Sequence, residues 1–143
     1  MNNDLYCKIF IDTKRLIMSD RTVEFFEKMQ GFFPSVREEY MKSIDEYGEL
    51  LETIVIEDIF MPRLLTLLRE NKNYQLLETI FEYFEEIVNS NDLYFINNIF
   101  SVTVLESLGN DKIILETAKQ YMGTKTMLLQ KRADRELGRI ENL

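Results

Sequence analysis

A run of thirteen uncharged residues, LYFINNIFSVTVL, occupies Leu93 to Leu105. Plotted at about 100° per residue, its apolar side chains point in every direction, which predicts a helix covered on nearly all sides. The run is too short to cross a membrane, which takes about 20 apolar residues. Two buried strands are the alternative, because Ile, Val and Thr recur in it. A helix is favoured, since Asn91 or Asp92 can cap its start and Gly109 can end it.

The segments around this run are amphipathic, and the clearest is 74–89. Its Leu, Ile, Phe and Val side chains recur at helical spacing, and its Gln and Glu side chains take the other side. Pro34 suits the first turn of a helix that ends near Tyr47, and Thr124 is the expected N-cap of the last helix. Pro62 interrupts the pattern of 50–71 and predicts a kink or break just before it. The predicted helices cover 19–30, 34–47, 50–71, 74–89, 93–108, 110–122 and 124–140.

The pattern therefore predicts an all-α fold: a single-domain bundle of about seven helices, in which helical hairpins stack around the buried helix. Shifting the chain by 38 residues aligns Leu76–Thr79 with Ile114–Thr117, and aligns the loop 71–73 with 109–111. Any two amphipathic hairpins of equal length align to some degree, which is the alternative explanation. The spacing resembles the HEAT type of α-solenoid repeat. The expected organisation is an N-terminal segment 1–18, stacked hairpins over 19–123 and a C-terminal capping helix over 124–143.

The charge of the chain is unevenly distributed. The formal net charge is -8, and residues 37–92 hold fourteen acidic and five basic residues, a balance of -9. Residues 125–143 hold five basic and three acidic residues, a balance of +2. Because nucleic-acid affinity depends on basic side chains that displace counterions, the composition argues against a nucleic-acid partner.

Residue types that usually carry chemistry are scarce. The chain has no histidine, and Cys7 is its one cysteine. These counts remove the usual general base, the usual metal ligands and an internal disulfide, so we expect a protein that is not an enzyme and uses no metal and no cofactor. A pocket for a small molecule inside the bundle stays open as a third class of function. No apolar secretory segment follows residues 1–4, and the expected location is the cytoplasm with no membrane partner.

The acidic middle of the chain is the candidate binding surface. Tyrosine beside an acidic helix face is typical of surfaces that bind proteins, although a solvated helix face and boundary packing are the plainer explanations. A di-metal site is disfavoured, because such sites pair glutamate with histidine. The candidate partner-binding residues are Glu49, Glu52, Asp58, Tyr74, Glu78, Glu82, Tyr83, Glu85 and Glu86.

The hairpin ending in SVTVLESLGNDKIILETAKQYMG, on a small acidic chain, resembles HEAT-like helical immunity proteins of bacterial polymorphic and contact-dependent toxin systems. The resemblance covers about residues 57–123 and transfers no individual functional residue. It implies a module that neutralises a cognate toxin, often a nuclease with a basic active site, by binding it. Charge agrees, since an acidic surface associates quickly with a basic partner. The alternative is a general adaptor or scaffold that holds a helix or peptide in a solenoid groove.

Overall fold

The computed structural model describes residues 20–47 and 52–143, and every regular element in these ranges is helical. The predicted N-terminal segment 1–18 lies outside them. The elements in chain order are α2 (Asp20–Phe32), η1 (Pro34–Val36), α3 (Arg37–Tyr47), α4 (Glu52–Val55), η2 (Ile56–Phe60), α5 (Met61–Glu70), α6 (Tyr74–Val88), α7 (Leu93–Phe95), η3 (Ile96–Leu105), α8 (Glu106–Leu108), α9 (Lys112–Lys119), α10 (Thr124–Glu136) and η4 (Ile140–Asn142).

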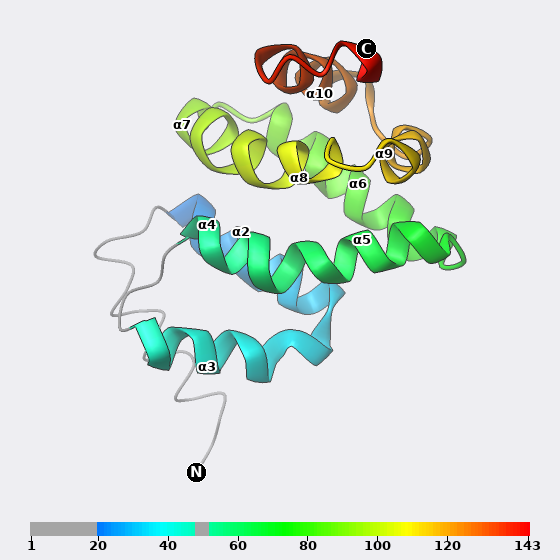
Figure 1. Ribbon diagram of the computed structural model, residues 1–143. Helices are drawn as coiled ribbons and strands as arrows, with labels where there is room; N and C mark the ends of the chain where they lie inside the picture. Colours follow the sequence, from blue (N-terminus) through cyan, green and yellow to red (C-terminus); the bar gives the residue numbers. More distant parts are fainter. Residues whose placement is uncertain (1–19, 48–51) are drawn as a thin grey trace.

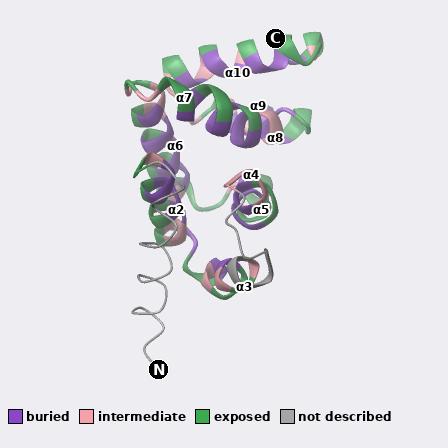
Figure 2. Ribbon diagram, turned by 90° about the vertical axis from the view of Figure 1, so that its left-hand side faces the viewer, coloured by how far each residue is buried: buried purple, intermediate pink, exposed green. Residues whose placement is uncertain are grey.

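Several of these elements continue one another without a break. The backbone stays right-handed helical from α4 through η2 into α5, and again from α7 through η3 into α8. Counted this way, the described ranges hold seven helical rods, so the predicted all-α single domain of about seven helices is confirmed. Figure 1 shows four rods stacked in the order α3, α4–α5, α7–α8 and α10, and Figure 2 shows α2 and α6 along one side of this stack.

The two predicted hairpins have their loops at the predicted residues. The first turns between α5 and α6 at 71–73, and the second turns between α8 and α9 at 109–111, which is 38 residues later. Asn73 and Asp111 each accept hydrogen bonds from backbone N–H groups of the helix that follows, as N-caps do. The segment 110–122 was expected to be amphipathic, and Ile113 departs from that expectation because its side chain is 80% exposed.

A kink or break was predicted just before Pro62, but the helical rod is not broken there. Pro62 lies in the first turn of α5, directly after the π-helical segment η2, and the N–H of Met61 bonds to the carbonyl of Ile56, five residues back. A π turn shifts the hydrogen-bond ladder by one residue. We infer that this wider turn accommodates the proline, which cannot donate a backbone hydrogen bond.

The uncharged run is helical, and Asp92 caps it by accepting the N–H of Phe95 at 3.2 Å. The prediction that it is covered on nearly all sides is wrong. Phe95, Ile96, Ile99, Phe100, Val104 and Leu105 are buried, whereas Leu93, Tyr94, Asn97, Asn98 and Val102 are exposed. The segment is π-helical, and its i→i+5 bonds put more residues in each turn than an α-helix has. Side chains five apart, such as Asn97 and Val102, therefore share one open side.

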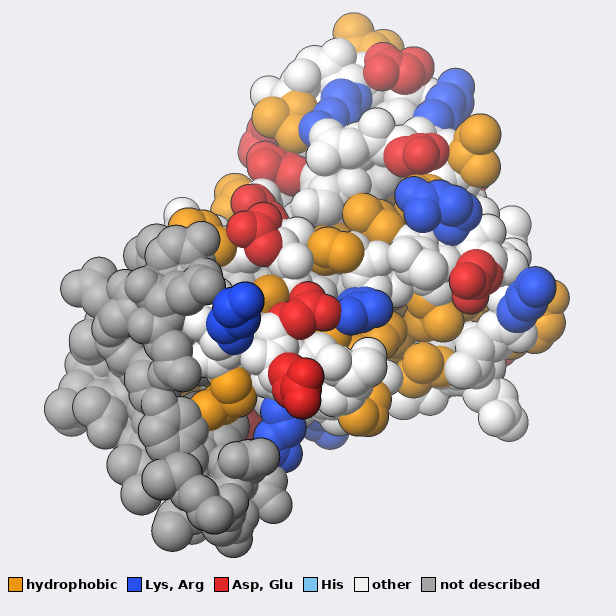
Figure 3. Space-filling view, turned by 60° about the horizontal axis from the view of Figure 1, so that its bottom comes forward, with side chains coloured by type: hydrophobic (Ala, Val, Ile, Leu, Met, Phe, Trp, Pro, Cys, Tyr) orange, Lys and Arg blue, Asp and Glu red, His pale blue; other side chains and the backbone are white. Residues whose placement is uncertain are grey.

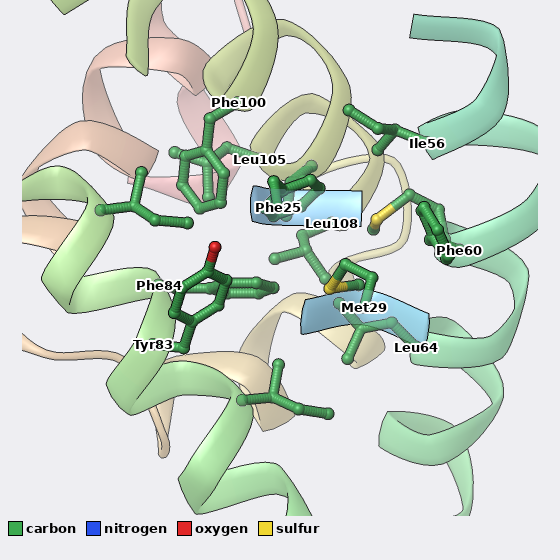
Figure 4. Close-up of a cluster of buried hydrophobic side chains, with 14 of the residues drawn as sticks. Phe25, Met29, Ile56, Phe60, Leu64, Tyr83, Phe84, Phe100, Leu105 and Leu108 are labelled. Atoms are coloured by element: carbon green, nitrogen blue, oxygen red, sulfur yellow. The ribbon is translucent and has the colours of Figure 1, made fainter. Parts of the chain in front are cut away.

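The core lies between α2, α6, η3 and the α4–α5 rod, and aromatic rings fill it (Figure 4). Phe84 of α6 meets Phe100 of η3 edge-to-face, with ring centroids 5.1 Å apart. Phe25 of α2 lies 6.3 Å from Phe100, again edge-to-face. Edge-to-face pairs add about 0.5–1.5 kcal/mol beyond the apolar burial itself. No helix within the described ranges is long and apolar enough to cross a membrane.

Candidate functional site

The acidic residues predicted on one side of α6 do form a row. Asn73 caps the helix through its side-chain oxygen. Tyr74, Glu78 and Glu82 then follow at intervals of four residues, which places them one above another on the helix. All three side chains are exposed, and Glu86 continues the row, also exposed. This part of the predicted surface is therefore accessible to a partner.

A pocket of about 370 Å³ opens between this row and the end of α9. It is lined by Tyr74, Glu78, Glu82, Gln120 and Tyr121. Three of the nine predicted residues therefore meet in one place, together with two residues that the sequence analysis did not include. Pockets that take ligands or side chains commonly begin near this size.

Tyr121 forms one wall of the pocket and is fixed from two directions. Its ring stacks on Phe81 of α6, with centroids 6.1 Å apart, and its hydroxyl donates a hydrogen bond to the side-chain oxygen of Asn71 at 2.6 Å. Burial, helped by the nearby Tyr74 and Glu78, raises the pKa of Tyr121. The phenol therefore stays protonated at neutral pH, and its ring is held in position before any partner arrives.

The composition of this pocket suits a cation. No ion pair between described residues involves Glu78, Glu82 or Glu86. Two carboxylates without a basic neighbour, beside two phenol rings, attract a Lys or Arg side chain through charge and through the electron-rich ring faces. Across the described ranges, no group of three His, Cys, Asp or Glu side chains lies close enough to hold a metal ion.

Glu85 was predicted to bind a partner, and the structure instead uses it inside the fold. Its Oε1 accepts the backbone N–H and the hydroxyl of Thr126, at 2.8 and 2.7 Å, and its Oε2 accepts the N–H of Lys125 at 3.1 Å. Partial burial acts to raise the pKa of Glu85, but the hydrogen bonds from Thr126, Lys125 and Asn89 lower it overall. A carboxylate with these bonds caps the positive end of α10.

The same contact corrects the predicted cap of the last helix. The N-cap residue of α10 is Gly123, and Thr124 is already inside the helix. A Cβ atom on Gly123 would lie 2.4 Å from the Cδ atom of Glu85, so only glycine leaves room for that carboxylate. The cap comes from a helix 40 residues earlier in the chain, and local sequence rules cannot show such a partner.

Tyr83 was also predicted to bind a partner and is 5% exposed. Its ring stacks on Phe25 at a centroid distance of 6.2 Å, and Lys28 Nζ lies 5.6 Å from the ring centroid (Figure 4). Burial and the nearby Glu24 raise the pKa of Tyr83 well above its ordinary value. Position 83 is one turn from both Ile80 and Ile87, which belong to the buried stripe. Helix α2 covers this flank, so Tyr83 belongs to the core.

The remaining predicted residues do not join the pocket. Glu49 lies outside the described residues. Glu52 is half-buried in α4, where burial raises its pKa and a hydrogen bond with Thr22 acts against that rise. Asp58 is exposed in η2, a different rod from α6. The predicted acidic surface is therefore not continuous, and its accessible part on α6 is the candidate site.

Acidity is not gathered on every face of the molecule. On the face shown in Figure 3, acidic and basic side chains alternate among apolar ones. Arg63 of α5 and Glu39 of α3, for example, form an ion pair at 2.6 Å. The unpaired row on α6 therefore differs from surfaces where the two charges neutralise each other.

Gln120 and Tyr121 were missed because they lie at the C-terminal end of the second hairpin. The ring of Tyr121 is half-buried. Helix α9 ends at Lys119, and Tyr121 follows in a turn. Its distance in sequence from Tyr74 hid the pairing, which depends on how α9 folds back beside α6.

Taken together, these features define a single-domain all-α protein with an exposed acidic and aromatic pocket. The chain belongs to the family described as Domain of unknown function (DUF7674), whose model matches residues 26–136. This match covers α6, α9 and the whole pocket. No curated protein and no solved structure matches the chain.

Proposed function

We propose that the protein is a non-enzymatic protein-binding module that holds a basic partner domain at the pocket between α6 and α9. The observation that carries this proposal is that two tyrosines, Tyr74 and Tyr121, line one pocket with two carboxylates, Glu78 and Glu82, that form no ion pair with any described residue. Ring and carboxylate together recognise a cation that either alone would bind weakly.

In this proposal a Lys or Arg side chain of the partner enters the pocket that the two tyrosines line. A cation over a phenol ring contributes about 0.5–2 kcal/mol, and more when water is excluded. The carboxylates of Glu78 and Glu82 add charge-assisted hydrogen bonds, which are about twice as strong as neutral ones. Tyr121 is already fixed by Asn71 and Phe81, so its ordering entropy is not lost again on binding.

We further propose that the partner is a bacterial toxin domain and that the module acts as its immunity protein in the cytoplasm. This step rests on the resemblance of residues 57–123 to HEAT-like immunity proteins and on the net charge of -8. An immunity protein must bind its toxin quickly, and opposite charges accelerate the encounter.

The test first asks whether a neighbouring gene encodes a large protein with a variable C-terminal domain, and uses that domain as the candidate partner. Its affinity and association rate are measured by surface plasmon resonance against the whole chain. The double reversal Glu78→Lys and Glu82→Lys should raise Kd at least about tenfold, and the association rate should lose its dependence on salt. Tyr74→Ala should weaken binding about two- to thirtyfold without changing the salt dependence.

A matched control carries the same change of net charge elsewhere. Glu38→Lys with Glu141→Lys alters two exposed carboxylates outside the pocket. This control should leave Kd within about twofold, because exposed rim charges contribute little. Equal loss in both double variants would show that net charge alone matters and would refute the pocket. Unchanged binding in both would favour the alternative, an adaptor that holds a helix or peptide in a groove.

A further inference from the structure

A second hollow, of opposite character, lies where α10 crosses the α7–η3 rod. Its volume is about 420 Å³. It is lined by Val88, Leu93, Ile96, Asn97, Lys125, Leu128, Leu129 and Arg132. None of these residues belongs to the acidic pocket, so this hollow is a separate surface.

The buried side chains that line the hollow are apolar, and two leucines at its rim are exposed. Ile96 and Leu129 are buried beneath it, whereas Leu93 is 65% exposed and Leu128 is 62% exposed. Covering one such leucine contributes about 1.5–3 kcal/mol. Two of them at one hollow form an apolar contact surface that the other described residues leave exposed.

Basic residues lie at both ends of this apolar stretch of α10. Lys125 and Arg132 are seven residues apart, which is about 10.5 Å along a helix. Leu128 lies between them and on the same side, because residues three and four apart share a helix face. No ion pair between described residues involves Lys125. Arg132 donates to the side-chain oxygen of Asn97 at 2.6 Å, which holds it at the rim. Its Nε also lies 3.8 Å from Glu136 Oε1, in an exposed ion pair within α10.

We propose that this hollow docks an acidic amphipathic helix of a partner protein. The matching helix has carboxylates seven residues apart, which face Lys125 and Arg132, and large aliphatic side chains between them, which enter the hollow beside Leu93 and Leu128. Charge complementarity selects this occupant, because Lys125, which forms no ion pair with a described residue, and Arg132 flank the hollow. A flat anionic membrane fits less well, because the apolar contact is concave.

The probe is a synthetic helical peptide of about five turns, with Glu at positions i and i+7 and Leu at i+3 and i+4 of each repeat. A second peptide carries Lys at every Glu position. Each is titrated into the full-length chain while backbone amide signals are followed by NMR. The acidic peptide should shift the signals of Leu93 and Leu128 saturably, and the basic peptide should not.

Reversing the two charges beside the hollow provides a control in which a gain of binding is expected, and not only a loss. The double variant Lys125→Glu with Arg132→Glu should bind the acidic peptide at least about tenfold more weakly and should gain binding of the basic peptide. Leu128→Ser should weaken binding of the acidic peptide. Leu137→Ser, at an exposed leucine outside the hollow, should not. Circular dichroism confirms that each variant is folded.

Several results would overturn the proposal. Both peptides could bind alike, neither could bind, or the shifted signals could map away from the hollow. Sedimentation of the free protein could reveal a dimer that Leu128→Ser abolishes, which would assign the hollow to a second copy of the chain. Anionic vesicles could bind through Leu128 while the acidic peptide does not, which would assign it to a membrane.

Discussion

Replacement of Gly109 by alanine tests how the C-terminal part of the chain is attached to the second hairpin. The backbone of Gly109 is ordinary, with φ -74, so alanine meets no conformational strain there. Its Cβ would nevertheless lie 2.4 Å from Asp134 Oδ1 and 2.6 Å from Arg139 Nη1. Asp134 is fully buried, and Gln130 Nε2 lies 3.3 Å from both of its carboxylate oxygens. The added methyl group must therefore displace part of a buried polar network.

Two opposing effects decide the sign of the change. Alanine at an unstrained position normally stabilises by about 0.4–1 kcal/mol, because it restricts the unfolded chain. Overpacking costs about 1–3 kcal/mol. Breaking a buried ion pair, here that of Arg139 with Asp134, costs about 3–5 kcal/mol. Arg139 also donates to the carbonyl of Glu106 at 2.9 Å, so its guanidinium cannot retreat freely. We expect a net loss of about 2–4 kcal/mol in the free energy of unfolding.

Urea denaturation followed by circular dichroism measures this loss as a lower midpoint at an unchanged slope. Gly31→Ala is the matched control, because nothing lies within 4 Å of its new Cβ and the position is inside α2, so it should stabilise slightly. In the background of Asp134→Ala the cost of Gly109→Ala should shrink, since the closest atom is gone. A Gly109→Ala chain as stable as the original would refute the close packing described here.

Three further predictions concern single side-chain groups. Glu85→Gln should lower the free energy of unfolding by about 0.5–2 kcal/mol at neutral pH, and Glu86→Gln, an exposed neighbour, should not. Because the folded-state pKa of Glu85 is lowered, its contribution is complete above the unfolded pKa of about 4.3 and is lost as the pH falls through the folded value. The difference between the original chain and Glu85→Gln should therefore close in acid, and a constant difference would contradict the cap. Tyr83→Phe removes a buried hydroxyl that has no hydrogen-bond partner among the described residues, so stability should stay equal or rise by up to about 1 kcal/mol. Tyr121→Phe removes a hydroxyl bonded to Asn71 and should cost about 0.5–1.5 kcal/mol in the same urea denaturation assay.

Sequence reasoning succeeded where the determining interactions are local. Asp92 caps the helix that directly follows it, and it was one of the two cap candidates, with Asn91, that residue type and position indicated. The loops at 71–73 and 109–111 followed from the same local signals. An all-α fold required no more than the helical period of the apolar residues.

The candidate site was only partly predictable, because it depends on contacts between distant segments. Tyr74, Glu78 and Glu82 share a side of α6 by helical spacing alone, so the sequence placed them correctly together. Glu85 lies on the same helix and differs in one respect: the start of α10 lies against it, 40 residues later. Tyr83 differs for a similar reason, since α2 covers its flank. Residue type cannot distinguish an exposed glutamate or tyrosine from one that a helix distant in the sequence covers.

The uncharged run shows a second limit, which concerns helix type. Both hairpins contain a π-helical segment in their first rod, and the two segments, η2 and η3, contact each other. The loops repeat at 38 residues, yet these segments begin at Ile56 and Ile96, which are 40 residues apart. The second π segment has ten residues and the first has five. The first rods of the two hairpins therefore depart from the 38-residue spacing, and the helices that follow the loops return to it. A projection at an α-helical angle cannot represent a change from α-helix to π-helix. Such a projection distributes over all sides of the helix some residues that the π-helix exposes on one side. Asn97 is among them, and it lines the hollow beside α10. The exposed position of Asn97 at the proposed docking surface is therefore a consequence of backbone geometry, and a projection that treats the run as covered on nearly all sides assigns it to the core.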